Sequence, residues 1–169
     1  MADVSDLPRP SQLWKQLASD RKLQAAEAFW GDENAAVEQA EAVVMIAQRI
    51  KFRPKSVMAL PREKKARHLV ASGAVSELVA ARLLVAYHLA HQRALMGSFL
   101  DALGIKHDQG LIEEEKMEPP PPEKLREAAA AIARDYPAGD VALYLSTLVW
   151  QDPETWGALA DVPATRAVA

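Results

Sequence analysis

Two histidines three residues apart, His88 and His91, are the pair whose type and spacing come closest to chemistry. Residues at this spacing share one face of an α-helix, and two imidazoles on one face can bind the same metal ion. Zinc takes three protein ligands in catalytic sites and four in structural sites, and the sequence offers no third ligand with matching helical spacing. We therefore predict no bound metal and no cofactor, and interpret the pair as histidines at a helix crossing. A metal- or cofactor-dependent enzyme built on these two residues is an alternative.

A run of basic residues is the second feature. Residues 49–67 hold eight of the 20 lysines and arginines and one acidic residue, so the segment has a net charge of +7 in a chain of net charge −3. Such a patch can attract nucleic acid, another polyanion or an acidic protein surface. Phe52 is its only aromatic residue, and nothing in it resembles a recognition helix or a stacking platform. The simpler interpretation is a helix end matched to the helix dipole, followed by solvated lysines. The candidate anion or partner patch is Arg49, Lys51, Arg53, Lys55, Arg62, Lys64, Lys65 and Arg67.

An acidic counterpart lies in residues 101–123, where seven acidic residues against two lysines give a net charge of −5. The same stretch contains four consecutive prolines, 119–122, which adopt an extended conformation and cannot continue a helix. We expect residues 105–121 to form an exposed connector, with 112–121 as the most mobile internal segment. The acidic residues either keep this connector in water or meet the basic patch, within one molecule or across a dimer.

Several classes of site and location are disfavoured by what the sequence lacks. It contains no cysteine, which excludes disulfides, thiolate zinc sites and cysteine nucleophiles and is typical of a reducing compartment. The glycines never cluster into a phosphate-binding loop. The first residues lack the basic start and apolar run of a signal peptide, and charged residues interrupt the only candidate membrane span. These absences favour a non-enzymatic, cytoplasmic protein with no membrane partner.

The stretch from Val75 to Gly104 organises the predicted fold. It contains no proline, and as one helix of about 30 residues it would be roughly 45 Å long. Apolar residues recur along it at steps of four and three, the spacing that holds one helix face against its neighbours. Arg82 and Gln92 fill the two gaps in this seam, which consists of Leu78, Val85, Leu89, Met96, Phe99 and Leu103. We predict an all-α multi-helix bundle around this central helix (residues 75–104), with about six to eight helices and no β-sheet.

Proline, glycine and cap signals divide the rest of the chain into shorter elements. They predict helices over residues 11–17, 20–30, 33–52, 61–71, 123–135 and 140–151, a short loop before Pro61, and a last short helix after Asp152. We expect residues 1–10 to be a flexible lead-in, 11–160 to be a single helical domain that includes the connector, and 161–169 to be a frayed tail. A short helix precedes a longer one three times, so an irregular array of helical hairpins is the alternative architecture.

These observations favour a helical interaction or regulatory module that acts through packed faces rather than through catalysis. The four tryptophans lie near predicted helix ends, where they complete the core or form a partner surface. The expected partner is another protein or a second copy of the chain, as in a homo-oligomer. Nucleic-acid or polyanion binding through residues 49–67 is the alternative from a different class.

Overall fold

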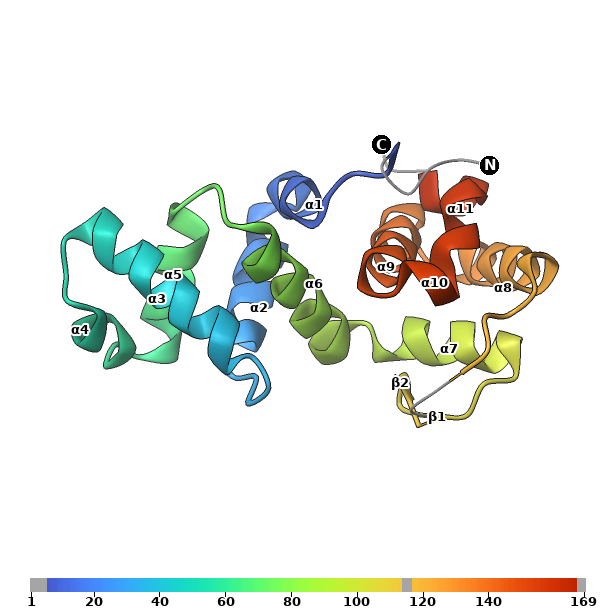
Figure 1. Ribbon diagram of the computed structural model, residues 1–169, viewed down its shortest axis with the longest axis horizontal. Coiled ribbons are helices and arrows are strands. Elements are labelled where there is room, and N and C mark those ends of the chain that lie inside the picture. Colours follow the sequence, from blue (N-terminus) through green and yellow to red (C-terminus); the bar gives the residue numbers. More distant parts are fainter. Residues whose placement is uncertain (1–5, 114–116, 167–169) are drawn as a thin grey trace. The chain divides into compact units, whose positions relative to one another are not determined.

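The computed structural model describes residues 6–113 and 117–166, and within these residues it is an all-α protein with one small hairpin (Figure 1). The predicted fold class is therefore confirmed. The described residues form eleven α-helices, one 3-10 helix and two short strands. The elements are α1 (Pro10–Gln16), α2 (Ser19–Trp30), α3 (Ala36–Ile50), α4 (Pro54–Met58), α5 (Arg62–Ala71), α6 (Glu77–His91), α7 (Arg93–Leu103), β1 (His107–Asp108), β2 (Leu111–Ile112), α8 (Pro122–Asp135), α9 (Ala138–Gln151), α10 (Pro153–Trp156), η2 (Gly157–Asp161) and α11 (Pro163–Arg166).

The predicted count of six to eight helices and the predicted absence of a sheet are wrong. The short segment before Pro61 contains α4, because Pro54 sits in the first helical turn, where its missing N–H is not needed. The C-terminal end adds α11, and the long central helix is two helices. None of the helices in the described part of the chain is both long and apolar enough to cross a bilayer.

The predicted central helix over residues 75–104 is interrupted at Gln92, so the prediction of one continuous helix is wrong. Gln92 has φ −125° and ψ 24°, and its carbonyl accepts a hydrogen bond from Met96 N at 3.0 Å as α7 begins. The interruption lies at the boundary between two compact units. The N-terminal unit comprises residues 10–90, and the C-terminal unit comprises the described residues up to Arg9 and from His91 onward. The single domain over residues 11–160 stays a prediction, because compactness does not measure independent folding.

The apolar seam predicted along this stretch also differs from the buried face of α6. Leu78, its first member, exposes 51% of its surface. The buried face of α6 begins one residue after Leu78. Its members are Val79, Ala80, Leu83, Leu84, Ala86, Tyr87 and His88. Because α6 is apolar around most of its circumference, the spacing rule fits more than one face. In α7, by contrast, Met96 and Phe99 are buried as predicted.

Small residues hold the N-terminal unit together. α2 and α5 pack against each other. The buried residues of these two helices include three alanines, Ala25, Ala26 and Ala66, whose short side chains allow two helix backbones to approach closely. Phe29 and Leu69 are buried beside them.

Polar contacts link α6 and Ser76, the residue before it, to α1 and α3 of the same unit. Ser76 Oγ donates to Glu41 Oε2 at 2.8 Å, and Ser11 N donates to Glu77 Oε1 at 2.9 Å. Arg82 Nε lies 3.7 Å from Glu38 Oε1. Arg82 thus occupies a gap in the apolar seam because it forms an ion pair at the start of α3.

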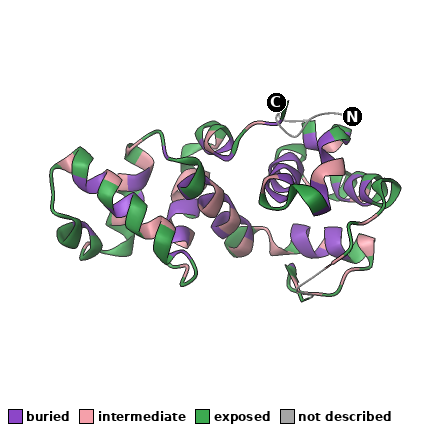
Figure 2. Cartoon of the chain, in the orientation of Figure 1, coloured by how far each residue is buried: buried purple, intermediate pink, exposed green. Residues whose placement is uncertain are grey.

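The buried helix of the C-terminal unit is α9, and every residue from Asp140 to Val149 is buried (Figure 2). α8, α10, η2 and α11 pack against it. Phe99 of α7 contacts the rings of Tyr144 and Trp156, with centroids 5.7 and 6.0 Å away. A helix that is apolar all round must be enclosed by others, and the sequence of α9 has this character.

The described parts of the expected lead-in and tail are packed on the C-terminal unit. Leu7 is buried, and Trp150 Nε1 donates to the carbonyl of Pro8 at 2.8 Å. At the other end, Arg166 Nε donates to the carbonyl of Ala160 at 2.7 Å. Residues 1–5 and 167–169, on which the rest of these predictions falls, lie outside the described residues.

The expected connector begins with a hairpin formed by β1 and β2, in which His107 pairs with Ile112 and Asp108 with Leu111. Gln109 and Gly110, both at positive φ, make the two-residue turn. His107 fixes the hairpin on α7, because its Nε2 donates to Asp101 Oδ1 at 2.7 Å and its Nδ1 accepts from Gly110 N at 3.0 Å. The mobility predicted for residues 112–121 falls partly on 114–116, outside the described residues, and stays a prediction.

We expect Gly110→Ala to lower the free energy of unfolding by about 1–2 kcal/mol, because alanine is disfavoured at positive φ. Gly110 has φ +90°, and an added Cβ would lie 2.7 Å from Cβ of Met96. Urea unfolding followed by tryptophan fluorescence measures the change. The matched control is Gly139→Ala, because a Cβ there meets nothing within 4 Å. Equal effects of the two substitutions would contradict the packing of the hairpin on α7.

Candidate functional site

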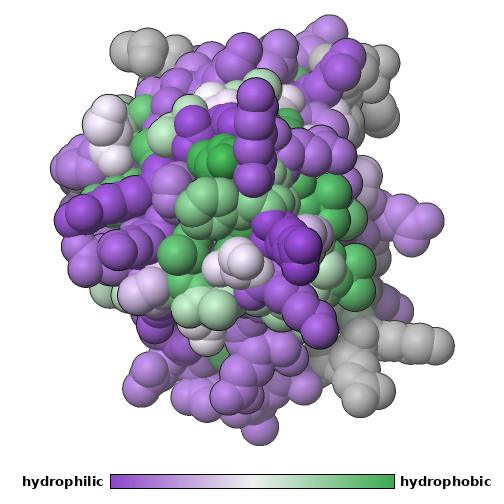
Figure 3. All heavy atoms as spheres, turned by 90° about the vertical axis from the view of Figure 1, so that its left-hand side faces the viewer, coloured by the Kyte–Doolittle hydropathy of each residue, from purple (hydrophilic) through white to green (hydrophobic). Residues whose placement is uncertain are grey.

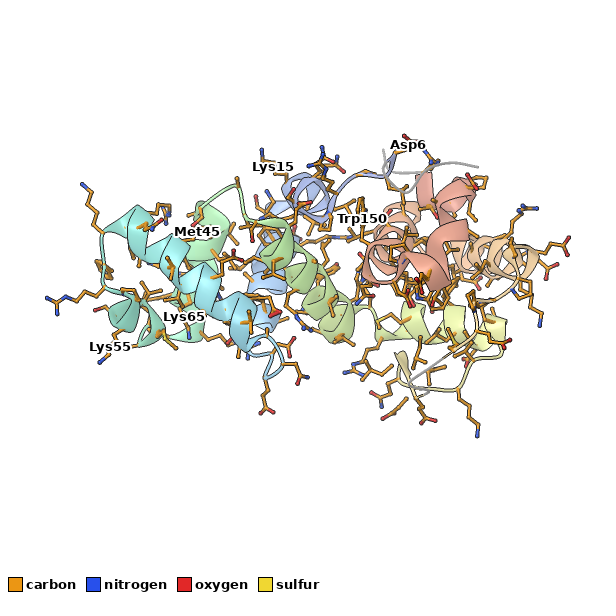
Figure 4. All side chains as sticks on the ribbon, viewed as in Figure 1. Asp6, Lys15, Met45, Lys55, Lys65 and Trp150 are labelled. Atoms are coloured by element: carbon orange, nitrogen blue, oxygen red, sulfur yellow. The ribbon has the colours of Figure 1, made fainter. Side chains whose placement is uncertain are left out.

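The eight basic residues of the predicted patch lie on one continuous part of the N-terminal unit, from the last turn of α3 through α4 to α5. Figure 4 shows Lys55 on α4 and Lys65 on α5. The structure divides the eight into two groups. Four side chains form a hydrogen bond, an ion pair or a ring contact within the unit, and four form none with any described residue.

Arg62 belongs to the first group because it binds the C-terminal end of α2. Its Nε donates to the carbonyl of Glu27 at 2.5 Å. The guanidinium lies directly over Gly31, where a Cβ would come within 2.5 Å of Arg62 Cζ. A cation at the carbonyl end of a helix is favourable for two reasons. It donates hydrogen bonds to the last carbonyl oxygens, and it lies at the negative end of the helix dipole. Arg62 is therefore a capping residue of α2.

Three further basic side chains are engaged within the unit. Lys65 Nζ lies 5.0 Å from the centroid of the Trp30 ring. Arg67 pairs with Glu63 one turn earlier on α5, with both side chains exposed. Arg49 Nη2 donates to His68 Nδ1 at 3.3 Å. The charges of Arg62 and Lys65 are thus used in holding α5 to α2, and the charge of Arg67 is balanced locally.

The second group consists of Lys51, Arg53, Lys55 and Lys64, all exposed. No hydrogen bond or ion pair is formed by these side chains with any other described residue. Four positive charges therefore face solvent at this end of the unit, and Lys55 extends away from the helices in Figure 4.

The turn that presents this group is built on an unusual residue. Lys51 ends α3 in the left-handed conformation, with φ 59° and ψ 39°. Phe52 N donates to the carbonyl of Ala47 at 3.0 Å, which completes the reverse turn that often ends a helix. Glycine is the usual residue at such a position, because other L-residues are strained there by about 1 kcal/mol. A lysine here is therefore tolerated at a cost in stability.

Two large apolar side chains lie exposed in the same segment, and the sequence analysis missed them as site residues. Phe52 exposes 50% of its surface and Met58 64%. Figure 3, which views the chain from the side of α3, α4 and α5, shows apolar side chains gathered in the middle of this face with hydrophilic ones around them. The exposure of Met58 was partly predictable, because a helix as short as α4 buries only Val57. We call Lys51, Phe52, Arg53, Lys55, Met58 and Lys64 the basic apolar surface.

A second group of exposed apolar side chains lies elsewhere on the N-terminal unit. Val37 and Val44 are one turn either side of Glu41 on α3, and Leu78 follows Ser76, the residue that bonds Glu41. The charged residue between Val37 and Val44 on α3 is Glu41, a carboxylate. The chemistry of this group therefore differs from that of the basic apolar surface.

The two histidines of the possible metal site have different environments. His88 exposes only 2% of its surface, whereas His91, the last residue of α6, is exposed. Burial lowers the pKa of His88 from its ordinary value of 6.5 to about 3, because the protein interior disfavours the charged imidazolium. In the described part of the chain, no group of three or more histidine, cysteine, aspartate or glutamate residues is placed to hold a metal ion. The arrangement therefore suits a core histidine and an exposed neighbour.

Comparison with known proteins gives no guide to function, because no family model, no curated protein and no solved structure matches this chain.

We expect stability to fall as the pH is lowered below about 6.5, because the unfolded chain then binds a proton at His88 that the folded protein, with its pKa of about 3, does not. The loss due to this residue should be about 2 kcal/mol between pH 7.5 and pH 5. Urea unfolding at both values, for the unaltered chain and for His88→Gln, measures it. The variant should lose about 2 kcal/mol less than the unaltered chain over this interval. An identical pH dependence of both proteins would contradict the burial of a neutral His88.

We expect Arg62→Ala and Gly31→Ala each to lower the free energy of unfolding by about 1 kcal/mol, because each removes the cap of α2. Their effects should not add, since a Cβ on Gly31 displaces the same guanidinium that Arg62→Ala deletes. A double-mutant cycle by chemical unfolding measures the coupling. Lys64→Ala, two residues along and exposed, is the control and should change stability by less than about 0.5 kcal/mol. Full additivity of the two substitutions would show that Arg62 does not bind α2.

Proposed function

We propose that this chain is a non-enzymatic helical interaction module that binds an acidic protein segment carrying an apolar side chain. The observation that supports the proposal is the basic apolar surface itself. Four exposed cations that form no hydrogen bond or ion pair with another described residue lie in the same short segment as two exposed apolar side chains. A partner that brings carboxylates and an apolar group satisfies both kinds of side chain.

The apolar residues supply most of the affinity in this proposal. Covering the exposed parts of Phe52 and Met58 would contribute about 1–2 kcal/mol each. Methionine adapts to partners of different shape, and aromatic anchors dominate many protein interfaces. The cations add less affinity, because ion pairs at an exposed rim contribute about 0–1 kcal/mol each, but they steer and orient an acidic partner.

Nucleic-acid binding remains the alternative, and the distribution of charge favours it less. Of the eight basic residues of the patch, four are engaged within the unit, including Arg62 over α2 and Lys65 over Trp30. The remaining four would release few counterions, whereas polyanion binding depends on many phosphate contacts. Met58 has no role in binding phosphates.

The proposal is tested with four probes of defined chemistry. They are a fluorescent peptide of alternating glutamate and leucine, a poly-glutamate peptide of the same charge, a short DNA in single- and double-stranded form, and phosphatidylserine vesicles. We expect the glutamate–leucine peptide to bind at least about tenfold more tightly than poly-glutamate, because the apolar anchor adds about 1.4 kcal/mol or more. Tighter binding of DNA with a steep salt dependence, preferential binding of vesicles, or no binding of any probe would each overturn the proposal.

Matched variants locate the binding. Phe52→Ser with Met58→Ser should weaken binding of the glutamate–leucine peptide by about tenfold or more. The loss of stability should be about 1–2 kcal/mol, because at least half of each side chain is already exposed, so the variant stays folded. Val37→Ser with Leu78→Ser changes equally exposed apolar residues outside the basic apolar surface, and should leave binding unchanged. If the two double variants weaken binding equally, the basic apolar surface is not the site.

A further inference from the structure

The hairpin of the C-terminal unit carries the complement of the basic apolar surface. Cross-strand partners in an antiparallel pair point to the same side of the sheet. His107 and Ile112 form one pair, and the hydrogen bonds of His107 to Asp101 and Gly110 place that pair against α7. Asp108 and Leu111 form the other pair, and both are exposed. The outer side of the hairpin therefore presents a carboxylate beside an apolar side chain.

The neighbouring residues extend this acidic and apolar character. Leu111 exposes 44% of its surface, which makes it one of the most exposed large apolar residues of the described chain. Glu113 is exposed and lies two positions after Leu111, on the same side of an extended strand, and its N–H donates to the carbonyl of Lys106 at 3.4 Å. Asp108, Leu111 and Glu113 form what we call the acidic hairpin surface. Two described cations lie beside it: Lys106, which is exposed, and Arg93, whose Nη1 donates to the carbonyl of Gln109 at 3.2 Å.

We propose that the basic apolar surface of one chain binds the acidic hairpin surface of a second copy of this chain. This inference rests on the proposed function and names its partner. The charges are opposite, since Lys51 and Arg53 would face Asp108 and Glu113. The apolar residues would meet in the middle, with Leu111 between Phe52 and Met58. Both surfaces are built on defined turns, because Lys51 itself ends α3 in the left-handed conformation, and Asp108 and Leu111 flank the turn at Gln109 and Gly110.

The contact is heterologous, because two different surfaces meet, so each chain retains one surface of each kind for further copies. Such contacts generate closed rings or open chains of subunits. The contact involves few residues on each side and falls in the class of small interfaces, below about 1,200 Å², which bind weakly. Self-association is therefore expected in the range of tens to hundreds of micromolar and should weaken with salt.

Analytical ultracentrifugation of the full chain, from about 10 to 500 µM in about 50 and 500 mM salt, measures this association. We expect the average mass to rise with concentration at low salt and to rise less at high salt. Lys51→Glu with Arg53→Glu places two acidic side chains where the proposed contact puts Asp108 and Glu113 of the second copy, although Lys55 and Lys64 stay basic. Asp108→Lys with Glu113→Lys places two basic side chains where the contact puts Lys51 and Arg53. Each double variant should stay monomeric alone. Their equimolar mixture should associate, because every contact then joins opposite charges.

The charge control is Arg126→Glu with Arg134→Glu, which makes the same change in net charge at two exposed positions on α8. This variant should associate like the unaltered chain. A chain that is monomeric at every concentration, or a mixture that does not associate, would overturn the proposal. If the glutamate–leucine peptide still binds in that case, the partner is wrong and the basic apolar surface stands as a binding site. If the peptide also fails to bind, the proposed function fails as well.

Discussion

The left-handed conformation of Lys51 is the constraint on which the basic end of this protein depends. It closes the end of α3 through the hydrogen bond from Phe52 N to the carbonyl of Ala47 and turns the chain into α4. A glycine would make the same turn with less strain. Under the proposed function, the charge that Lys51 brings to the binding surface offsets this cost in stability, since strained residues tend to concentrate at functional sites.

Basic residues that look equivalent in the sequence have different roles because of what lies behind them. Arg62 faces Gly31 at the end of α2, and Lys65 faces the ring of Trp30, so both stabilise the contact between α2 and α5. Lys64, between them in the sequence, points away from this contact and is exposed. The helical repeat separates these roles, because neighbouring residues on α5 point about 100° apart.

The all-α fold and most helix positions were predictable, since prolines, glycines and apolar spacing are local signals. The break at Gln92 was not, because no proline or glycine marks it; it lies at the boundary between two compact units. The buried face of α6 was missed because an almost uniformly apolar helix fits several seams. The basic patch is recognisable as a stretch of positive charge in the sequence, and its role as a binding site stays a prediction. Which of its members are engaged depends on tertiary contacts, such as that of Arg62 with Glu27, which no local pattern encodes.

The substitution Lys51→Gly tests most directly whether this turn serves binding rather than folding. Relief of the strained backbone should raise the free energy of unfolding by about 1 kcal/mol, while loss of the charge should weaken binding of the glutamate–leucine peptide. Gln109→Gly relieves the other non-glycine residue at positive φ in the described chain and should raise stability without changing peptide binding. Opposite signs for stability and binding at Lys51 are the predicted result. A Lys51→Gly variant that is less stable, or that binds the peptide as well as the unaltered chain, would contradict the account.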